Sequence, residues 1–322
     1  MMQSLWLENQ SLSLREISLP AKPGDALIRV RLSGICGTDL ELLRGYYPFT
    51  GVPGHEFVGE VVSIPESDEV STNWIGKRVV GEINVACGTC EQCRRQGRPT
   101  HCEQRSVLGI TNRDGVHAEY TTLPLANLYL VPASIPDEAA VFTEPLAAAL
   151  EIQQQIHIQP TDRVLLVGAG RLGQLIAQTL ALTGCDLRVV ARYPHQQALL
   201  ESRHIRLISD EAVQPRRWDV VVEATGSPSG FDLARHAIRP RGTLVLKSTY
   251  RGEMTMNWSP FVVDEITILG SRCGPFAPAL RLLASAQVDP TILIAGRFPL
   301  ANALDAIAAA QQPGALKVLL KP

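Results

Sequence analysis

Apolar residues follow two different patterns along the chain, and the change falls near residue 145. The first part contains short apolar runs separated by glycine and proline: ALIRVRL, EFVGEVVSI, KRVVGEI and AEYTTL. Such runs are typical of strands in a β-rich, partly barrel-shaped domain. The later runs RVLLV, LRVV, DVVVEA, GTLVLK and EITILG are continuously apolar, which predicts strands buried on both faces of a parallel sheet.

Segments with helical patterns alternate with these later runs. Residues 146–156 are typical of a helix, and residues 171–184 carry one apolar face. Alternating strands and helices predict an α/β fold with a doubly wound parallel sheet, the Rossmann type that binds nucleotides. The last part of the chain returns to mixed elements, with helices expected over 276–286 and 301–310 and a strand over 315–320.

The composition and charge of the chain argue against nucleic-acid and membrane partners. The 322 residues suggest about two domains, and 30 basic against 32 acidic side chains leave a formal charge of −2, which argues against a nucleic-acid surface. No apolar run approaches the roughly 18 to 20 residues that span a bilayer. The N-terminal segment lacks the basic-then-apolar pattern of a signal peptide. We therefore expect a cytoplasmic protein with no membrane and no nucleic-acid partner.

A glycine-rich turn follows the first continuous run. Gly168, Gly170 and Gly173 form GxGxxG directly after RVLLV and at the start of a helical pattern, with Arg171 and Leu172 between the last two glycines. Glycines are needed there for the tight turn, for close approach of a pyrophosphate and for packing of the helix on the strand. The motif in this context predicts a dinucleotide site.

The residue after the second continuous run bears on which dinucleotide binds. NAD-preferring folds place an acidic residue there, but Arg192 follows LRVVA, and Asp186 precedes that strand and belongs at its opposite end. A guanidinium group in this place favours a 2′-phosphate and hence NADP(H) over NAD(H). The alternative is a solvated arginine in a loop, with NAD also accepted.

Cysteines are the unusual part of the composition. Their total of seven is odd, which excludes a framework in which all are paired in disulfides. Four of them have the spacing C-x2-C-x2-C-x8-C, at Cys87, Cys90, Cys93 and Cys102. Four thiolates in one loop predict a closed, tetrahedral structural zinc in a lobe at about 86–103. The alternatives are a zinc ribbon for nucleic acid, which would normally use two separated C-x2-C pairs, and a metal-free loop of free thiols.

A second set of metal-binding residue types lies further upstream. Cys36 stands in GICGTDLE, and His55 and Glu56 stand in GVPGHEFVGEV. A thiolate, an imidazole and a carboxylate form a mixed ligand set of the kind used when one position of a zinc ion stays open. The alternative is that the cysteine and the histidine only pack in glycine-bounded turns.

The order of these motifs resembles a known family. GICGTDLELLRG, GVPGHEFVGEV, the four-cysteine lobe, DGVHAEY, TEPLAAAL, GAGRLG and EATGS occur in the order found in the zinc-containing medium-chain alcohol dehydrogenase superfamily. The branch of threonine, polyol and glucose dehydrogenases is the most similar, because Glu144 stands where the alcohol dehydrogenases proper carry a cysteine ligand. The resemblance implies a GroES-like catalytic domain over 1–144 and 270–322 and a Rossmann domain over 145–269.

The resemblance also implies roles for individual residues. Cys36 and His55 would ligate a catalytic zinc, and Glu144 would add a ligand directly or through water. Glu56 would ligate the zinc, as in polyol-type members, or support the ligands without binding the metal, as in other members. Asp39 would orient His55, unless it is only a turn residue. The hydroxyl of Thr38 would touch the zinc-bound alcohol or else cap a helix, and Thr225 would contact the cofactor. Arg272 would line the cofactor phosphates and the domain interface, or else bind a polar or anionic substrate.

Two positions depart from the family pattern. Glu41 stands where many relatives have a proton-relaying histidine, and His117 replaces a common aromatic residue, which we interpret as a packing change.

We expect a homo-oligomeric (dimeric or tetrameric) enzyme that transfers hydride between a small alcohol, polyol or sugar and NADP(H). The alternative is a protein that keeps the fold and binds NADPH without catalysis.

Overall fold

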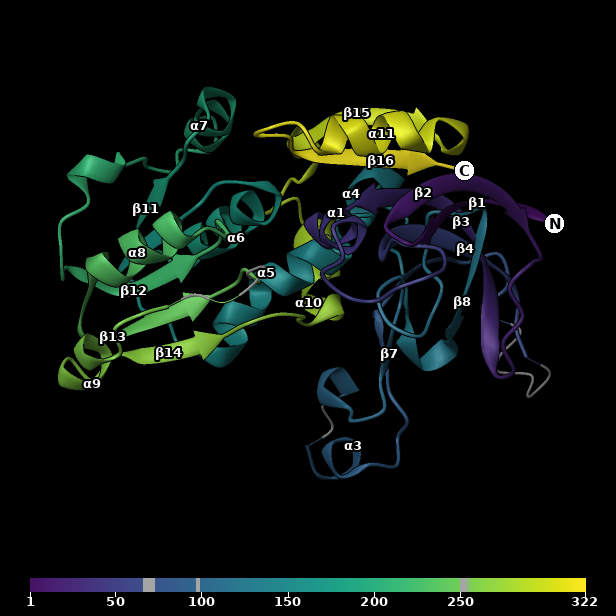
Figure 1. Ribbon diagram of the computed structural model, residues 1–322, viewed down its shortest axis with the longest axis horizontal. Coiled ribbons are helices and arrows are strands. Elements are labelled where there is room, and N and C mark those ends of the chain that lie inside the picture. The colour runs from purple at the N-terminus through teal and green to yellow at the C-terminus, as the bar shows by residue number, and fades with distance from the viewer. Residues whose placement is uncertain (66–72, 97–98, 250–252, 254) are drawn as a thin grey trace. The chain divides into compact units, whose positions relative to one another are not determined.

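The computed structural model describes residues 1–65, 73–96, 99–249, 253 and 255–322. The chain divides into two compact units, Met1–Glu144 with Phe276–Pro322, and Pro145–Pro275 (Figure 1). The return to the first unit therefore falls at Phe276 instead of the expected 270. The loop before it packs on the second unit, since a Cβ atom at Gly274 would lie 2.0 Å from the carbonyl oxygen of Ala147.

The first unit is built on a seven-stranded sheet in the order β15-β16-β3-β4-β5-β9, with β8 also paired to β3. The strands of this sheet are β3 (Asp25–Ile35), β4 (Glu56–Ser63), β5 (Arg78–Gly81), β8 (Tyr120–Pro124), β9 (Leu128–Leu130), β15 (Ile294–Pro299) and β16 (Lys317–Lys321). Two small antiparallel pairs accompany it, β1 (Met2–Glu8) with β2 (Ser11–Ile17), and β6 (Asn84–Val85) with β7 (Ser106–Val107).

Short helices complete the first unit. They are α1 (Gly37–Leu43), α3 (Glu91–Gln96), α4 (Asp137–Ala140), α10 (Phe276–Ala284) and α11 (Ala303–Ala310), with 3-10 turns at Pro99–His101, Leu125–Asn127, Thr291–Leu293 and Leu300–Asn302. The strand β16 pairs antiparallel with β3 although the two are far apart in sequence, so that Leu319 lies opposite Gly34. This pairing brings the last strand of the chain to the end of β3, where the candidate metal ligands begin.

The second unit contains a five-stranded parallel sheet in the order β11-β10-β12-β13-β14. Its strands are β10 (Arg163–Val167), β11 (Asp186–Val190), β12 (Trp218–Glu223), β13 (Ile238–Leu246) and β14 (Thr267–Gly270). Its helices are α5 (Thr143–Gln155, which begins at the end of the first unit), α6 (Arg171–Ala181), α7 (Pro194–Glu201), α8 (Pro228–Ala237) and α9 (Ser259–Val263), with a 3-10 turn at Asp210–Ala212.

The predicted doubly wound sheet is confirmed. The middle residues of β10 and β12 are fully buried, as continuous apolar runs require when helices cover both faces of a sheet. The crossover helix α6 buries Leu175, Ile176 and Leu180. Within the described ranges, no helix combines the length and the apolar character needed to cross a bilayer.

An ionic cluster in the first unit leads to a prediction about pH and stability. Asp137 accepts hydrogen bonds from Nε of Arg31 and from Nη1 of Arg78, both at 2.7 Å. Burial by itself would raise the pKa of Asp137, but the two guanidinium groups outweigh it and hold that pKa below its usual value. A depressed pKa stabilises the fold above the unfolded-state value of about 3.9, and the stabilisation is lost as pH falls through the folded-state value.

Asp137→Asn is therefore expected to lower the free energy of unfolding by about 1 kcal/mol at pH 7. The loss should shrink at pH 3, where the wild-type carboxylate takes up protons. Urea unfolding of both proteins at the two pH values measures the difference, and Asp232→Asn, at an exposed position of α8, is the matched control. An equal loss at both pH values would contradict the ionic explanation.

Candidate functional site

Three predicted ligands lie together where β3 ends and β4 begins. Cys36 follows β3 and caps α1, and Glu56 is the first residue of β4, directly after His55. Because Gly34 and Glu56 are register partners in the antiparallel pair, the ends of the two strands meet. One ligand atom from each of Cys36, His55 and Glu56 lies within 4.8 Å of the others. His55 and Glu56 are almost completely buried.

The Glu56 side chain is held by a lysine that the sequence did not draw attention to. Lys317, at the start of β16, forms a buried ion pair with Oε2 of Glu56, and its ammonium group also lies 5.6 Å from the centre of the Phe142 ring. The pair depends on Gly34, since a Cβ atom there would lie 2.5 Å from Oε2 of Glu56. A lysine inside the apolar run ALKVLL was the only signal of this contact in the sequence.

The atoms of this cluster fit a zinc ion. Oε1 of Glu56 is buried and has no hydrogen-bond partner among the described residues, although its other oxygen is paired. An unpaired buried carboxylate oxygen is costly unless something positive binds it. Sulfur, nitrogen and oxygen donors from three side chains are the set expected of a catalytic zinc with an open position. The chemistry of the donors and the unpaired oxygen therefore agree with the predicted metal centre.

Asp39 lies behind His55, where the resemblance implied an orienting carboxylate. Its Oδ1 is 3.4 Å from Nδ1 of His55, and its Oδ2 accepts a hydrogen bond from the backbone nitrogen of Cys36 at 2.8 Å. Burial alone would raise the pKa of Asp39, but the neighbouring imidazoles outweigh it and keep that pKa well below its usual range. Burial opposes a charged His55, yet Asp39 and Cys36 raise the pKa of His55 above its usual value.

His117 was interpreted as a packing change, and the structure contradicts that interpretation. It is fully buried, with Nε2 at 3.4 Å from Oδ2 of Asp39 and Nδ1 at 3.0 Å from Oγ of Ser33. Both ring nitrogens therefore have polar partners. The isolated histidine in GVHAEY carried no sign of this, because its partners lie 78 and 84 positions away in the chain.

Two further predicted residues, Glu144 and Thr38, lie near the cluster of Cys36, His55 and Glu56 but outside it. Glu144, in the first turn of α5, does not belong to the set of ligand atoms that all lie within 4.8 Å of one another. Burial raises the pKa of Glu144 to about 7, with Glu56 adding to the shift and His55 opposing it. The hydroxyl of Thr38 is 3.8 Å from Sγ of Cys36. Cys36, and not Thr38, caps α1, so the capping alternative for Thr38 is wrong.

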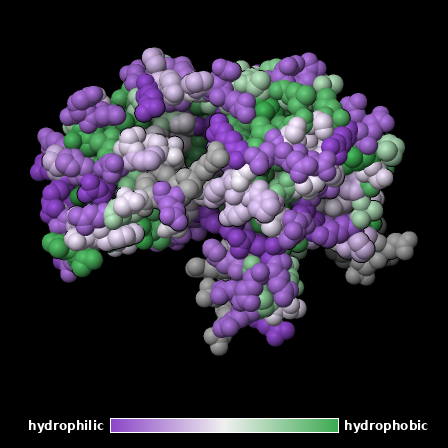
Figure 2. Space-filling model, in the orientation of Figure 1, coloured by the Kyte–Doolittle hydropathy of each residue, from purple (hydrophilic) through white to green (hydrophobic). Residues whose placement is uncertain are grey.

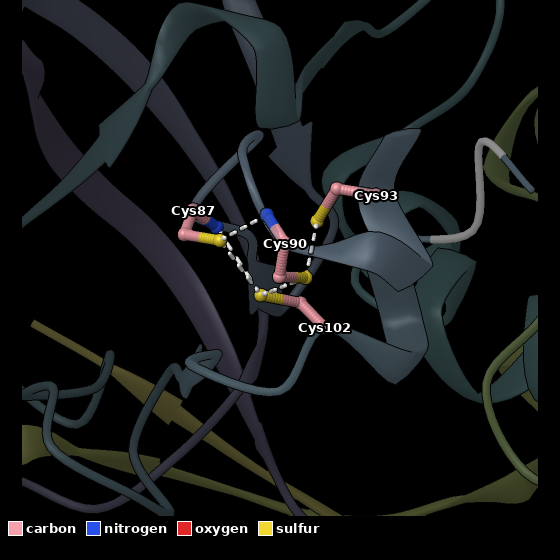
Figure 3. Close-up of side chains that lie close together, drawn as sticks. All are labelled: Cys87, Cys90, Cys93 and Cys102. Carbon is pink, nitrogen blue, oxygen red and sulfur yellow. Dashed lines mark hydrogen bonds between the residues drawn. The ribbon is translucent and has the colours of Figure 1, made fainter. Parts of the chain in front are cut away.

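The four cysteine side chains of the lobe lie close together, as their spacing in the sequence predicted (Figure 3). The sulfur–sulfur distances are 3.4 Å for Cys90 and Cys93, 3.5 Å for Cys87 and Cys102, and 3.8 Å for Cys90 and Cys102. Tetrahedral zinc with bonds of about 2.3 Å places its sulfurs about 3.8 Å apart, so the arrangement fits the ion. The surface of the lobe around α3 is mainly hydrophilic on the face that Figure 2 shows, and a metal bound by the four cysteines would stabilise such a lobe.

Hydrogen bonds already favour a thiolate in this lobe. The hydroxyl of Thr89, and then the backbone N–H groups of Thr89 and Cys90, lower the pKa of Cys87 to about 6. The hydrogen bond with Cys90 raises the pKa of Cys93 to about 12. Cys87 is thus ready to bind a metal at neutral pH, and binding at Cys93 releases a proton.

The predicted glycine turn joins β10 to α6 in the second unit. Gly168 has φ +107°, and a Cβ atom on it would lie 2.9 Å from the backbone of Ala224. A Cβ atom on Gly173 would lie 2.2 Å from the carbonyl oxygen of Gly168, which shows why the helix and strand need glycine there. Gly170 has nothing within 4 Å in its Cβ direction. This open space at the start of α6, beside Arg171 and Leu172, fits a pyrophosphate.

The other predicted cofactor residues lie in loops of the same unit. Arg192 follows β11, is exposed, and has no acidic partner within the described part of the chain, whereas Asp186 begins β11 and pairs with Arg188. Thr225 follows β12 and donates to buried Glu223 at 2.5 Å. Arg272 lies in the loop after β14, where its carbonyl oxygen accepts a hydrogen bond from Lys247 at 3.0 Å.

Comparisons with known proteins agree with this architecture. The chain matches the family model of the alcohol dehydrogenase GroES-like domain over residues 22–133 and that of zinc-binding dehydrogenases over residues 172–285. It is 30% identical to the erythritol/L-threitol dehydrogenase of Mycolicibacterium smegmatis, covering 96% of this chain and 94% of that protein. It is 31% identical to an L-threonine 3-dehydrogenase of Shewanella frigidimarina, covering 76% of each.

Two solved structures have the same fold. A short chain alcohol dehydrogenase of Escherichia coli CFT073 in complex with NADH has a TM-score of 0.89 at 27% identity. A zinc-binding dehydrogenase of Sinorhizobium meliloti 1021 bound to NADP has a TM-score of 0.89 at 29% identity. Each alignment covers 100% of this chain and 99% of the other. The chain therefore belongs to the zinc-containing medium-chain alcohol dehydrogenase superfamily, in its branch of polyol and threonine dehydrogenases.

Proposed function

We propose that the protein is a zinc-dependent dehydrogenase that transfers hydride between an alcohol, polyol or sugar, or the matching carbonyl compound, and NADP(H). The observation that carries the proposal is the convergence of Cys36, His55 and Glu56, with one carboxylate oxygen left without a partner. The relatives' names support alcohol and polyol substrates.

Zinc, when bound, would act as a Lewis acid that lowers the pKa of a substrate hydroxyl, and the nicotinamide would accept or donate the hydride. Cys36, His55 and Glu56 would hold the metal. Glu144 would add a ligand directly or through water, which its position near the cluster supports. Oδ1 of Asp39 lies 3.4 Å from Nδ1 of His55, and this carboxylate would keep the proton on Nδ1 and leave Nε2 as the nitrogen with a lone pair for the metal.

The hydroxyl of Thr38 would accept the proton of the substrate alcohol and pass it outward. Its hydroxyl lies beside Sγ of Cys36, at the start of α1, so it can accept a hydrogen bond from an alcohol bound there. Glu41 lies one turn further along α1 and pairs with Arg44 at 2.6 Å. This carboxylate, in place of the histidine of many relatives, would form the outer end of the proton path.

In the second unit, the backbone at Gly168, Gly170 and Gly173 would hold the pyrophosphate, with Arg171 and Leu172 lining the turn. Thr225 would contact the cofactor from the loop after β12, and Arg272 would contact it from the loop after β14. Arg192 would bind the 2′-phosphate of NADP(H), which its exposure and its lack of a carboxylate partner in the described ranges support.

Arg192→Ala is expected to lower kcat/KM for NADP(H) by about 10- to 100-fold and to leave kcat/KM for NAD(H) nearly unchanged. The reason is the loss of one charge-assisted contact of about 1.5 to 3 kcal/mol. Steady-state kinetics with both cofactors measure it. Arg188→Ala is the matched control, because this arginine of β11 is already paired with Asp186. A wild-type protein that prefers NAD would refute the assignment of Arg192.

The function itself is tested with a panel of alcohols, polyols, sugars and their carbonyl forms. We expect absorbance changes at the wavelength of the reduced cofactor for at least one class, and loss of the activity when the catalytic zinc is removed by a chelator. NADPH binding by calorimetry without turnover across the whole panel would instead favour a non-catalytic protein.

The assembly and location of the protein are part of the proposal. We propose a homo-oligomer, either a dimer or a tetramer. The apolar patch on and next to α9, at the lower left of Figure 2, supports this, because Trp258, Val262 and Val263 are 58%, 77% and 79% exposed. We propose a cytoplasmic location, since all seven cysteines are free of disulfides.

A further inference from the structure

The buried residue His117 is held by its backbone, and its ring packs against a glycine. Its backbone N–H donates to the carbonyl oxygen of Pro53 at 3.1 Å, and its carbonyl oxygen accepts from the backbone nitrogen of Leu5 at 2.8 Å. The ring lies against Gly54, where a Cβ atom would approach Nδ1 to 2.6 Å. The glycine before His55 thus makes room for a second imidazole directly beside the candidate metal ligand.

The partners of the ring decide which nitrogen carries the proton. Oδ2 of Asp39 is a carboxylate oxygen and can only accept, so Nε2 of His117 must be the donor at 3.4 Å. In the neutral ring Nδ1 then has a lone pair, which accepts a hydrogen bond from the hydroxyl of Ser33 at 3.0 Å. Ser33 is itself fully buried on β3, so this hydroxyl has a fixed place.

Asp39 is therefore shared between two imidazoles. Its Oδ1 faces Nδ1 of His55 at 3.4 Å, and its Oδ2 receives both Nε2–H of His117 and the backbone N–H of Cys36. With two donors on Oδ2, the carboxylate cannot rotate without losing hydrogen bonds inside a buried site. The orientation that keeps both hydrogen bonds is the one in which Oδ1 of Asp39 faces Nδ1 of His55.

We propose that His117 is a positioning residue of the metal centre, which holds Asp39 so that Asp39 in turn holds His55 in the orientation and tautomer that bind zinc. The proposal rests on the proposed function, because it requires a metal at Cys36, His55 and Glu56. A group that supports a metal-bound histidine through a carboxylate typically changes metal affinity by about 10- to 100-fold when it is removed. Zinc affinity, and not turnover alone, is thus the property that His117 should control.

Three variants separate the hydrogen bond from the packing. Glutamine in His117→Gln can place an N–H donor where Nε2 of the histidine lies. Asparagine in His117→Asn is shorter and can place a polar group only where Nδ1 lies. His117→Phe keeps an aromatic ring but has neither nitrogen. Thr121→Val controls for packing nearby, because the buried hydroxyl of Thr121 on β8 has no hydrogen-bond partner among the described residues. All four proteins are first compared with wild type by circular dichroism and melting temperature.

Two readouts follow. The zinc dissociation constant is measured by competition with a coloured chelator, with metal analysis to separate this site from the four-cysteine lobe. The visible spectrum is measured with Co²⁺ in the site and Zn²⁺ kept in the lobe, since its bands report ligand geometry. We expect His117→Phe and His117→Asn to bind zinc about 10- to 100-fold more weakly with altered cobalt bands, and His117→Gln to stay within about threefold of wild type.

Other outcomes overturn the proposal. Wild-type affinity and spectra in all three His117 variants would show that the hydrogen bond to Asp39 has no effect on the metal. Equal weakening in His117→Gln, His117→Phe and Thr121→Val would assign His117 to packing. A wild-type protein that holds zinc only in the four-cysteine lobe would overturn the metal centre itself, which is the separate failure of the proposed function.

Discussion

Replacing Cys36 by serine is expected to lower kcat/KM by at least about a thousandfold and to remove one of the two proposed zinc ions. Serine is similar in size but is a far poorer zinc ligand than a thiolate, so the site would keep an imidazole and carboxylates but no sulfur ligand. A Lewis acid supplies several kcal/mol to the activation of a bound alcohol, and about 1.4 kcal/mol corresponds to each tenfold in rate. Loss of the metal should therefore remove nearly all turnover.

The control for this prediction is Cys185→Ser. Cys185 belongs to the second unit, where its sulfur lies 3.8 Å from the carbonyl oxygen of Leu180 and not in either cysteine cluster. We expect this variant to retain both zinc ions and the wild-type rate. Metal analysis and steady-state kinetics measure both properties. Full activity in a Cys36→Ser protein that has lost one zinc would rule out the zinc mechanism.

Replacing Lys317 by methionine is expected to destabilise the metal-free protein by about 3 to 5 kcal/mol. Methionine keeps much of the volume of lysine but removes the charge that balances Glu56, and both side chains are at most 2% exposed. In the zinc-loaded protein the loss should be smaller, because the metal supplies positive charge to the same carboxylate.

Urea unfolding of metal-free and zinc-loaded protein measures this effect. The double variant Glu56→Gln with Lys317→Met is the informative control, because it removes both charges together. We expect it to be more stable than Lys317→Met alone, since a buried ion pair is mainly costly when only one partner is removed. A Lys317→Met protein as stable as wild type without metal would show that the ion pair does not carry the charge of Glu56.

Much of the fold was predictable from the sequence, because the signals are local. A strand buried on both faces must be continuously apolar, so β10 and β12 were visible in RVLLV and DVVVEA. The glycines of the turn after β10 follow from backbone geometry at single positions, such as the φ of +107° at Gly168. The four cysteines converge because their spacing confines them to one loop.

The mixed metal site was only half predictable. Cys36, His55 and Glu56 are close in sequence to the ends of two neighbouring strands, and their residue types suggested a metal. Family resemblance then indicated Asp39. The resemblance also led to the wrong interpretation of His117, since an unusual residue in a familiar motif was assumed to change packing alone.

Tertiary structure decided the partners of the buried charges. Glu56 and Lys317 are 261 positions apart, and they meet because β16 pairs with β3 beside β4. His117 reaches Asp39 across 78 positions, because Gly54 leaves space for its ring. The sequence by itself determined which segments form strands, helices and turns and which residues could bind metal and cofactor. The order of strands in the sheet, which depends on long-range pairing and not on local pattern, determined which of those residues support one another.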